Sequence, residues 1–206
     1  MPDVFEKLAK IFKDFPGIGP RQARRFVYHL LGRSESQLKE FSDLVGELKK
    51  LVKTCSLCCR FHSSGAAVCA ICRDKGRDRS TLLVISKDSD LSAIEQSGVY
   101  KGLYFVLGGT VPILEKEPER KIRIRELLAQ ILERVKKDKL REIIISMNVN
   151  PEGENTASYL RSRLEKLVKE HSLKLAAPGR GLSTGLELEY SDPETIKNAL
   201  ERRSGV

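Results

Sequence analysis

The sequence predicts an α+β protein of several domains, in which helices come first, a cysteine-rich segment follows and strands then alternate with helices. Three observations support this prediction. Apolar residues recur at helical spacing before residue 53. All five cysteines lie between Cys55 and Cys72. Beyond residue 80, short runs of branched apolar residues alternate with amphipathic stretches, which is typical of an α/β layer with a mostly parallel sheet.

These changes in pattern divide the chain into four parts. We expect a helix-hairpin-helix module over residues 1–54, a four-cysteine zinc finger over 55–79, an α/β domain over 80–177 and a small strand–helix segment over 178–206. A chain of 206 residues is long enough for one sizeable core and a smaller module.

The charge of the chain indicates the kind of partner. The formal net charge of +9 favours a polyanion, most often a nucleic acid. No apolar run approaches the length of a membrane span, and the charged residues close to Met1 are unlike a secretory signal. We therefore expect a cytoplasmic protein with no membrane partner, in a reducing compartment that suits thiolate ligands better than disulfides.

The first part of the chain predicts two helices joined by a sharp turn. Apolar spacing places the first helix over residues 3–14, and Pro16 ends it. Pro20 suits the first turn of the second helix, which should run to about Leu31. On this second helix, apolar residues such as Ala23 share one face and the arginines lie on the opposite face.

The turn between these helices is a candidate phosphate site. Gly17 and Gly19 lack a Cβ, so the backbone N–H groups of the turn can approach a phosphate closely. The following helix adds the positive end of its dipole, and Arg21 and Arg25 add charge without reading bases. We predict that these four residues bind DNA without sequence preference. The alternative is an ordinary αα-hairpin with a solvated basic face, and such hairpins also serve as dimer contacts.

A third helix is expected after Ser34. Ser34 and Gln37 have the spacing of a capping box, which closes the start of a helix. The helix that follows carries an apolar stripe, which should lie in the core or in a subunit interface. The stripe consists of Leu38, Phe41, Leu44, Val45, Leu48, Leu51 and Val52.

The cysteine segment predicts a structural zinc site. Cys55 and Cys58 form one C-x2-C pair, and Cys69 and Cys72 form a second, with ten residues between the pairs. Two such pairs can present four thiolates to one Zn²⁺ in a tetrahedral site, which leaves no position open for a catalytic water. Four thiols that merely pack, or a redox C-x-x-C pair, are the alternatives.

Two further residues of this segment could enter the site. Cys59 could replace Cys58, although the matched spacing of the pairs favours Cys58. His62 could replace a cysteine, which would give three thiolates and one imidazole. The expected role of the metal is to supply folding energy, about 10–16 kcal/mol of apparent binding free energy in isolated finger peptides at neutral pH.

The second half of the chain predicts a parallel sheet. Apolar runs indicate four strands, at 81–86, 103–107, 142–146 and 173–177. Helices should connect them, and sites in such sheets lie at the carboxyl ends of the strands. A further short strand is expected over 186–190 and a last helix from Pro193 to about Arg202.

The motifs occur in an order that resembles one protein family. They are PGIGPRQARR, the two C-x2-C pairs, LLVISKDSDLSAIEQSGVYKGLYFVLGG, NPEGENTASYL and GLELEYSD, and they cover nearly the whole chain. In this ordered set the chain is similar to the RecR family of bacterial recombination mediators. The resemblance implies a helix-hairpin-helix module, a zinc finger, a Toprim domain and a ring-like tetramer that can encircle DNA. It also implies partnership with RecO and RecF in loading recombinase onto gapped DNA.

The chain departs from the family pattern at three places. Ser86 stands at the end of the first strand of the α/β domain, where relatives usually carry glutamate. The loop after Gly108 and Gly109 reads Glu-Lys-Glu-Pro over residues 115–118 instead of Gly-Ile-Gly-Pro. Ser-Thr at 183–184 replaces the usual Pro-Val. These departures concern the contacts of the loops.

The acids that a catalytic Toprim domain needs are replaced in this chain. Catalytic members hold Mg²⁺ with a glutamate after the first strand and an Asp-x-Asp pair after the third. Here those places hold Ser86, Asn148 and Asn150, whose neutral groups cannot compensate the charge of the ion. We predict no catalytic residue and no enzyme activity, and we interpret Asp88 and Asp90 as helix-start acids or as contacts for a protein partner.

These features leave three alternative functions. A DNA-binding scaffold or clamp in recombinational repair fits the charge, the hairpin and the family resemblance. A Mg²⁺-dependent Toprim nuclease would need the missing acids, and a zinc-containing RNA-binding module would need aromatic-rich RNA-reading strands. The glycine-rich stretch from Gly179 to Gly185 lacks the Gly-Lys-Ser/Thr of a nucleotide-binding loop, so we expect no ATPase activity.

Overall fold

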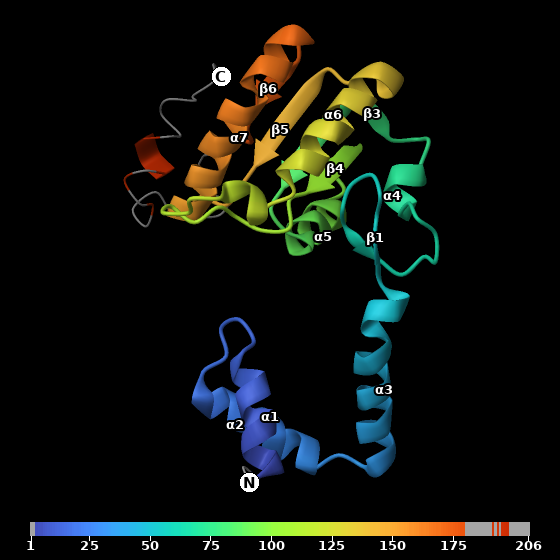
Figure 1. Ribbon diagram of the computed structural model, residues 1–206, viewed down its shortest axis with the longest axis vertical. Helices are drawn as coiled ribbons and strands as arrows, with labels where there is room; N and C mark the ends of the chain where they lie inside the picture. Colours follow the sequence, from blue (N-terminus) through green and yellow to red (C-terminus); the bar gives the residue numbers. More distant parts are fainter. Residues whose placement is uncertain (1–2, 180–190, 192, 194, 198–206) are drawn as a thin grey trace. The chain divides into compact units, whose positions relative to one another are not determined.

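The computed structural model describes residues 3–179, 191, 193 and 195–197 (Figure 1). The chain divides into two compact units, Met1–Val52 and Lys53–Val206. The short strand expected over 186–190, and most of the helix expected over 193–202, lie outside the described residues. No helix in the described part of the chain combines the length and the hydropathy that a membrane crossing requires.

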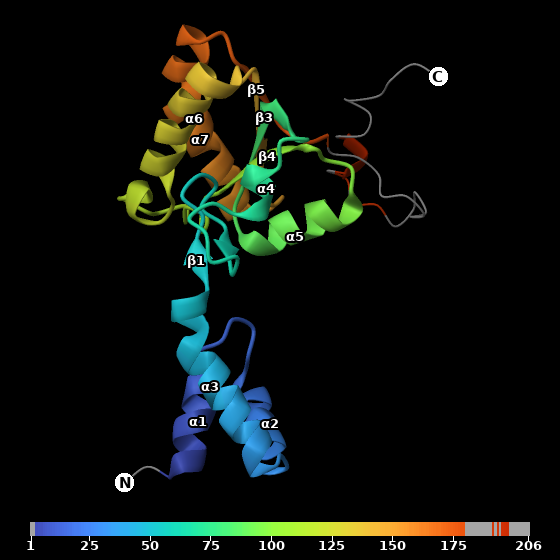
Figure 2. The ribbon, with the colours of Figure 1, turned by 90° about the vertical axis from the view of Figure 1, so that its right-hand side faces the viewer.

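The first unit begins with a pair of helices that pack along one another (Figures 1 and 2). Ala9 of the first helix is buried, as are Ala23 and Val27 of the second, because small and branched side chains let the two helices approach closely. Aromatic pairs support the contact, with ring centres 4.9 Å apart for Phe5–Tyr28 and 5.5 Å apart for Phe12–Phe26. The helices are α1 (Val4–Lys13) and α2 (Pro20–Leu31).

The third helix, α3 (Glu35–Leu51), starts at the predicted capping box. The Ser34 Oγ accepts a hydrogen bond from the Gln37 N–H at 3.3 Å, and the Gln37 Oε1 accepts one from the Ser34 N–H at 3.2 Å. None of its residues is buried, and large side chains of its apolar stripe such as Phe41 and Leu48 are exposed. The part of the prediction that placed this stripe in the core of the chain is wrong for the described residues; a subunit interface stays a prediction.

The second unit contains a four-stranded parallel sheet in the order β4-β3-β5-β6. Each strand lies close to its predicted range, since runs of branched apolar residues favour strands that are buried on both faces. The strands are β3 (Asp78–Ile85), β4 (Gly102–Val106), β5 (Glu142–Ser146) and β6 (Lys174–Ala176).

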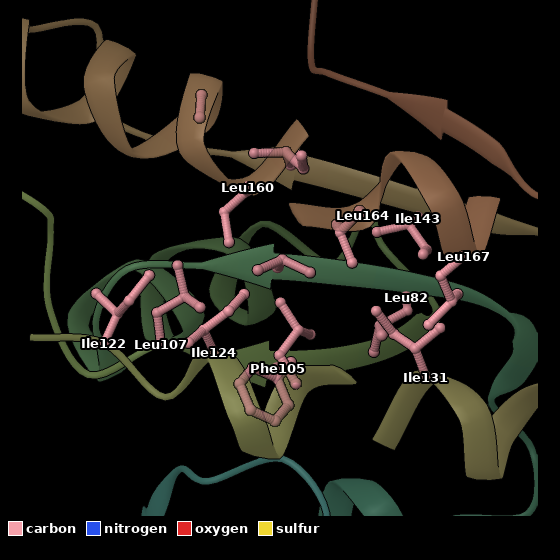
Figure 3. Close-up of a cluster of buried hydrophobic side chains, with 14 of the residues drawn as sticks. Leu82, Phe105, Leu107, Ile122, Ile124, Ile131, Ile143, Leu160, Leu164 and Leu167 are labelled. Atoms are coloured by element: carbon pink, nitrogen blue, oxygen red, sulfur yellow. The ribbon is translucent and has the colours of Figure 1, made fainter. Parts of the chain in front are cut away.

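Two long helices, α6 (Ile124–Asp138) and α7 (Pro151–Glu170), cover one face of this sheet (Figure 2). Their apolar side chains meet those of the strands in the larger core, which Figure 3 shows in close-up. Because successive residues of a strand point to opposite faces, Leu82 and Val84 of β3 belong to this core. Other residues of the core include Phe105, Leu107, Ile131, Ile143, Leu160 and Leu164.

The opposite face of the sheet packs against α5 (Asp88–Ser97) and the cysteine segment. Leu83 and Ile85 of β3 point to this side, where they meet Tyr104 and Val106 of β4 and Leu91 of α5. The cysteine segment is thus part of the second core of the α/β domain. The segment contains β2 (Phe61–His62), which pairs antiparallel with β1 (Lys53–Thr54) just before it, and α4 (Ala70–Arg73). The short helix η1 (Pro118–Arg120) lies in the loop before α6.

Candidate functional site

The four cysteines of the two C-x2-C pairs come together in one buried cluster. Cys55, Cys58, Cys69 and Cys72 are each at most 3% exposed, and their sulfur atoms all lie within 4.8 Å of one another. The Sγ atoms of Cys58 and Cys69 are 3.7 Å apart. A tetrahedral site with Zn–S bonds of about 2.3 Å has sulfur atoms about 3.8 Å apart. The cluster therefore has the donor set and the size that a zinc ion needs.

Local backbone bonds shape each pair into a tight turn around the cluster. In the first pair the Cys59 N–H donates to the Cys55 carbonyl at 3.0 Å, and Cys59 has a φ of 60°. In the second pair the Arg73 N–H donates to the Cys69 carbonyl at 3.1 Å. The Cys69 N–H donates to the Cys55 sulfur at 3.3 Å, which joins the two turns.

The crowding of four thiols explains why the cluster suits a cation. Hydrogen bonds from Cys58 and its neighbours lower the pKa of the Cys55 thiol. Hydrogen bonding to Cys55 favours the protonated forms of Cys58 and Cys72 and raises the pKa of both thiols, and burial acts in the same direction. Four thiolates can share this buried volume only when a divalent cation compensates their charge.

The spare cysteine and the histidine lie outside this cluster. Cys59 packs into the larger core on the other face of the sheet, and burial raises the pKa of its thiol. The His62 Nδ1 lies 2.8 Å from the Ser64 Oγ. Neither His62 nor Cys59 belongs to the group of four residues that could hold a metal ion. The arrangement thus favours Cys58 over Cys59 as the fourth thiol, as the matched spacing of the pairs suggested.

The glycine turn has a conformation that depends on glycine at its first position. Gly17 has a φ of +76°, a left-handed conformation that other residues adopt at a cost of about 1 kcal/mol or more. Gly19 is extended at the N-cap of α2, and as a glycine it has no side chain that could accept a capping bond. A Cβ added to either glycine would meet no atom within 4 Å, so the outer surface of the turn is open to an approaching ligand.

A basic groove lies between α1 and α2 beside this turn. Its volume is about 720 Å³. Arg21 and Arg25 line it from α2, and Lys10 and Lys13 line it from α1. The sequence reasoning missed the two lysines, because lysines in the last turn of a helix are usual partners of its dipole. The other residues that line the groove are Glu6, Ala9, Pro20, Arg24 and Tyr28.

One acid of the groove is already neutralised. Glu6 forms an ion pair with Arg24 at 3.0 Å, with both side chains more than half exposed. The charge that remains in the groove is therefore positive. Within the groove, Arg21, Arg25, Lys10 and Lys13 have no carboxylate partner among the ion pairs of the described residues.

The acids after β3 are engaged within the chain. The Ser86 Oγ donates to Asp90 Oδ2 at 2.6 Å, and the Lys87 N–H donates to the same oxygen at 2.9 Å, so Asp90 closes the start of α5. Asp88 Oδ1 accepts a hydrogen bond from the Phe61 N–H at 2.8 Å. Asp88 thus bridges α5 and the cysteine segment, a long-range contact that the sequence pattern did not reveal.

The residues after β5 also serve the backbone. Asn150 Oδ1 accepts a hydrogen bond from the Gly153 N–H at 2.8 Å and caps α7. A Cβ on Gly153 would lie 2.0 Å from the Asn148 carbonyl oxygen, so only glycine fits there. Glu152 accepts a hydrogen bond from the Thr110 hydroxyl at 3.0 Å. Among the described residues, the four cysteines form the single group of three or more ligands close enough to hold a metal ion.

An ion-pair network joins the exit of the cysteine segment to α5 and β4. Arg77 binds both carboxylate oxygens of Glu95, and the Tyr104 hydroxyl donates to Glu95 at 2.6 Å. Burial alone would raise the pKa of Glu95, but the hydrogen bonds from Arg77 and Tyr104 outweigh it and lower the pKa. The carboxylate form is therefore the one that the folded protein stabilises.

Replacing Glu95 with glutamine should lower the stability of the second unit at neutral pH by about 1–3 kcal/mol, because charged hydrogen bonds are lost. A carboxyl group whose pKa is lowered by folding contributes stability above its unfolded pKa of about 4.3 and loses it as the pH falls through the folded value. The difference between wild type and Glu95→Gln should thus shrink as the pH falls into the acid range. Thermal unfolding at pH 7 and pH 3 measures it.

Glu165→Gln provides the matched control for this prediction. Glu165 pairs with Lys169 at 2.6 Å on α7, where both side chains are more than half exposed. An exposed pair of this kind contributes little to stability, because water and salt screen its charges, so the control should unfold close to wild type at both pH values. Equal effects of the two substitutions at pH 7 would contradict the role given to Glu95.

Comparison with known proteins finds matches to two separate parts of the chain and to the chain as a whole. A family model described as "RecR, helix-hairpin-helix" matches residues 5–50, and a Toprim domain model matches residues 80–175. Recombination protein RecR of Syntrophobacter fumaroxidans is 38% identical over 98% of this chain and 94% of the relative. Recombination protein RecR of Staphylococcus aureus is 37% identical over 98% of both chains. The chain therefore belongs to the RecR family of recombination proteins.

Proposed function

We propose that this protein is a non-catalytic DNA-binding scaffold, or clamp, in recombinational DNA repair. The observation that carries the proposal is the basic groove between α1 and α2, which brings together four cations from two helices next to the open glycine turn. The names of the relatives support a role in recombination. The positive net charge supports a polyanionic partner.

In this proposal the hairpin binds the phosphate backbone of DNA. The amides at the start of α2 bind phosphate oxygens near Gly17 and Gly19, while Arg21 and Arg25 add charge. Lys10 and Lys13 extend the same surface along α1. Phosphate contacts position a protein on DNA but carry no sequence information, so binding to single- and double-stranded DNA is nonspecific.

We assign the thiol cluster a structural zinc ion, one per chain. Cys55, Cys58, Cys69 and Cys72 hold the ion, which supplies folding energy and ties the cysteine segment to the α/β domain. A closed site with four sulfur ligands has no position for substrate. The ion therefore takes no part in chemistry on DNA.

The proposed scaffold works as part of an assembly in the cytoplasm, associated with the nucleoid. Its partners are RecO and RecF, with which it helps to load recombinase at gapped DNA, and further copies of the chain in a ring-like tetramer. The exposed apolar stripe of α3 supports association with another chain, since exposed apolar surface of this extent is typical of interaction sites. Asp88 and Asp90 are the proposed partner contacts on the α/β domain.

The same protein should bind DNA and leave it intact. The groups at the carboxyl end of the sheet serve as helix caps and backbone partners, which supports the absence of phosphoryl-transfer chemistry. We expect purified protein to bind gapped DNA of any sequence, with an affinity that falls steeply as salt rises. With Mg²⁺ present, gel analysis of the labelled DNA should find no cleavage. Cleavage that is lost in Asp88→Ala or Asp90→Ala would favour the nuclease instead.

A further inference from the structure

Two arginines of the α/β domain bind backbone carbonyls in the cysteine segment. Arg123, the residue before α6, donates from Nη1 to the Cys59 carbonyl at 2.8 Å and to the Val106 carbonyl at 3.2 Å. Arg79 in β3 donates from Nη2 to the Cys72 carbonyl at 3.5 Å. Each C-x2-C turn is thus in contact with one guanidinium from outside the segment, and the shorter bonds belong to Arg123.

Neighbouring residues confine the side chain of Arg123. Gly108 has a φ of +86°, and a Cβ added there would lie 3.0 Å from the Arg123 Cζ. On the other side, the guanidinium lies 5.8 Å from the centre of the Phe61 ring. The Arg123 N–H also donates to the Leu107 carbonyl at 3.0 Å, so both the backbone and the side chain are fixed.

Residues 58–62 are bound by three different elements. The Val106 N–H of β4 donates to the Cys58 carbonyl at 2.8 Å. Asp88 of α5 accepts from the Phe61 N–H at 2.8 Å. Arg123 completes the set at the Cys59 carbonyl. The backbone beside the second thiol of the cluster is therefore held against the end of the sheet.

Charge adds a second reason for an arginine at this place. Four thiolates around one Zn²⁺ leave two net negative charges on the centre. These charges lie in a buried environment, where opposite charges attract more strongly than in water. The Arg123 guanidinium bonds the carbonyl of Cys59, the residue next to the proposed ligand Cys58, and so brings a positive charge to this side of the centre.

We propose that Arg123 is a positioning residue of the metal centre, which locks the Cys58 turn against β4 and thereby slows the loss of zinc. The inference rests on the proposed assignment of zinc to the four cysteines. Groups that orient metal ligands from outside the coordination sphere typically change metal affinity by about 10–100-fold. Arg123 acts through the backbone of Cys59 and does not itself touch the metal.

The test measures the rate at which full-length protein loses zinc to a chromophoric chelator. Arg123→Ala should release zinc at least about 10-fold faster than wild type. Arg123→Lys should recover part of the effect, because it keeps one donor and the charge. Arg125→Ala is the matched control, since Arg125 is exposed and forms no ion pair among the described residues, and it should release zinc at the wild-type rate.

A second control separates positioning from general destabilisation. Leu167→Ala removes an apolar side chain from the core on the other face of the sheet, far in sequence from the cysteines, and should lower the melting temperature. It should leave the rate of zinc release near the wild-type value below the unfolding transition. Asp88→Ala should accelerate release, and Asp88→Asn, which keeps an acceptor for the Phe61 N–H, should accelerate it less.

The possible failures are distinguishable. Wild-type release rates in Arg123→Ala, or equal acceleration by Leu167→Ala, would overturn the inference and leave the zinc site standing. Wild-type protein without zinc would overturn the inference together with the proposed metal. If Arg123→Ala does not fold, Arg123→Lys provides the test, and a wild-type rate of zinc release in Arg123→Lys would refute the role of Arg123.

Discussion

Replacing Cys58 with serine should abolish zinc binding and unfold the region around the cysteine segment. A serine hydroxyl is not ionised at neutral pH, so the site loses one of its four anionic ligands. Zinc sites of this kind supply about 10–16 kcal/mol of apparent free energy in isolated peptides, which is comparable to the total stability of a domain. Metal analysis should find wild-type protein with one zinc per chain and the variant with none. Circular dichroism should find a lower and broader unfolding transition in the variant.

Cys59→Ser is the matched control for this change. Cys59 neighbours Cys58 in sequence but packs into the larger core and lies outside the thiol cluster. It should keep its zinc and lose only the small packing contribution of one buried sulfur. A Cys59→Ser protein without zinc would mean that the wrong cysteine has been assigned to the site.

Chelation of the wild-type protein extends the same test. If zinc is structural, its removal should disrupt the fold and the oligomer first, and DNA binding should be lost as a consequence. Loss of DNA binding while fold and oligomer survive would instead give the cysteine segment a direct role in binding DNA. Sizing and DNA titration on the same chelated sample distinguish these outcomes.

Replacing Arg21 and Arg25 together with alanine should weaken DNA binding about 100-fold at low salt. Each arginine lines the basic groove, and a charged hydrogen bond to phosphate contributes about 1.5 kcal/mol or more. The loss should be the same for all DNA sequences. The slope of log affinity against log salt should become shallower by about 2, since two phosphate contacts are removed. Fluorescence anisotropy at several salt concentrations measures both effects.

Lys166→Ala with Lys169→Ala removes the same charge from another surface. Both lysines lie on α7, more than 70% exposed, and each pairs with a glutamate one turn away. This control should change DNA affinity much less than the arginine pair, and zinc content should stay unchanged in both variants. Lys10→Ala with Lys13→Ala tests the extension of the groove and should also weaken binding. If the arginine variant binds as wild type does, the hairpin is not the DNA site.

The helical part of the fold could be predicted because its signals are local. Pro20 and the apolar period of Ala23 and Val27 define α2 and its buried face, and Ser34 with Gln37 defines the start of α3. The four strands were predictable for a similar reason, since continuous apolar runs mark strands buried on both faces. The order of the strands was not, because it depends on pairing between segments far apart in the chain.

The candidate site could likewise be predicted where its signals are local, but not where it depends on contacts between distant segments. Regular spacing within a short segment revealed the four cysteines, whose sulfur atoms the fold brings together. No such pattern predicts the contacts of Arg123 and Asp88. Arg123 binds a carbonyl 64 residues away, and Asp88 binds an N–H 27 residues away. The role of Lys10 and Lys13 became visible only when α1 was placed against α2. Sequence periodicity reports the faces of single elements, whereas such contacts depend on how elements are assembled.

The strand order has a consequence for folding while the chain is being synthesised on the ribosome. β3 lies between β4 and β5, and its second edge stays open until residues 142–146 have been synthesised. The cysteine segment emerges well before that point, so a nascent chain could bind the proposed zinc ion while its sheet is still incomplete. A metal centre that forms early would cover one face of β3 while the open edge of this strand could still pair with other chains and aggregate. Zinc starvation should therefore reduce the yield of newly made protein more than it harms protein that has already folded.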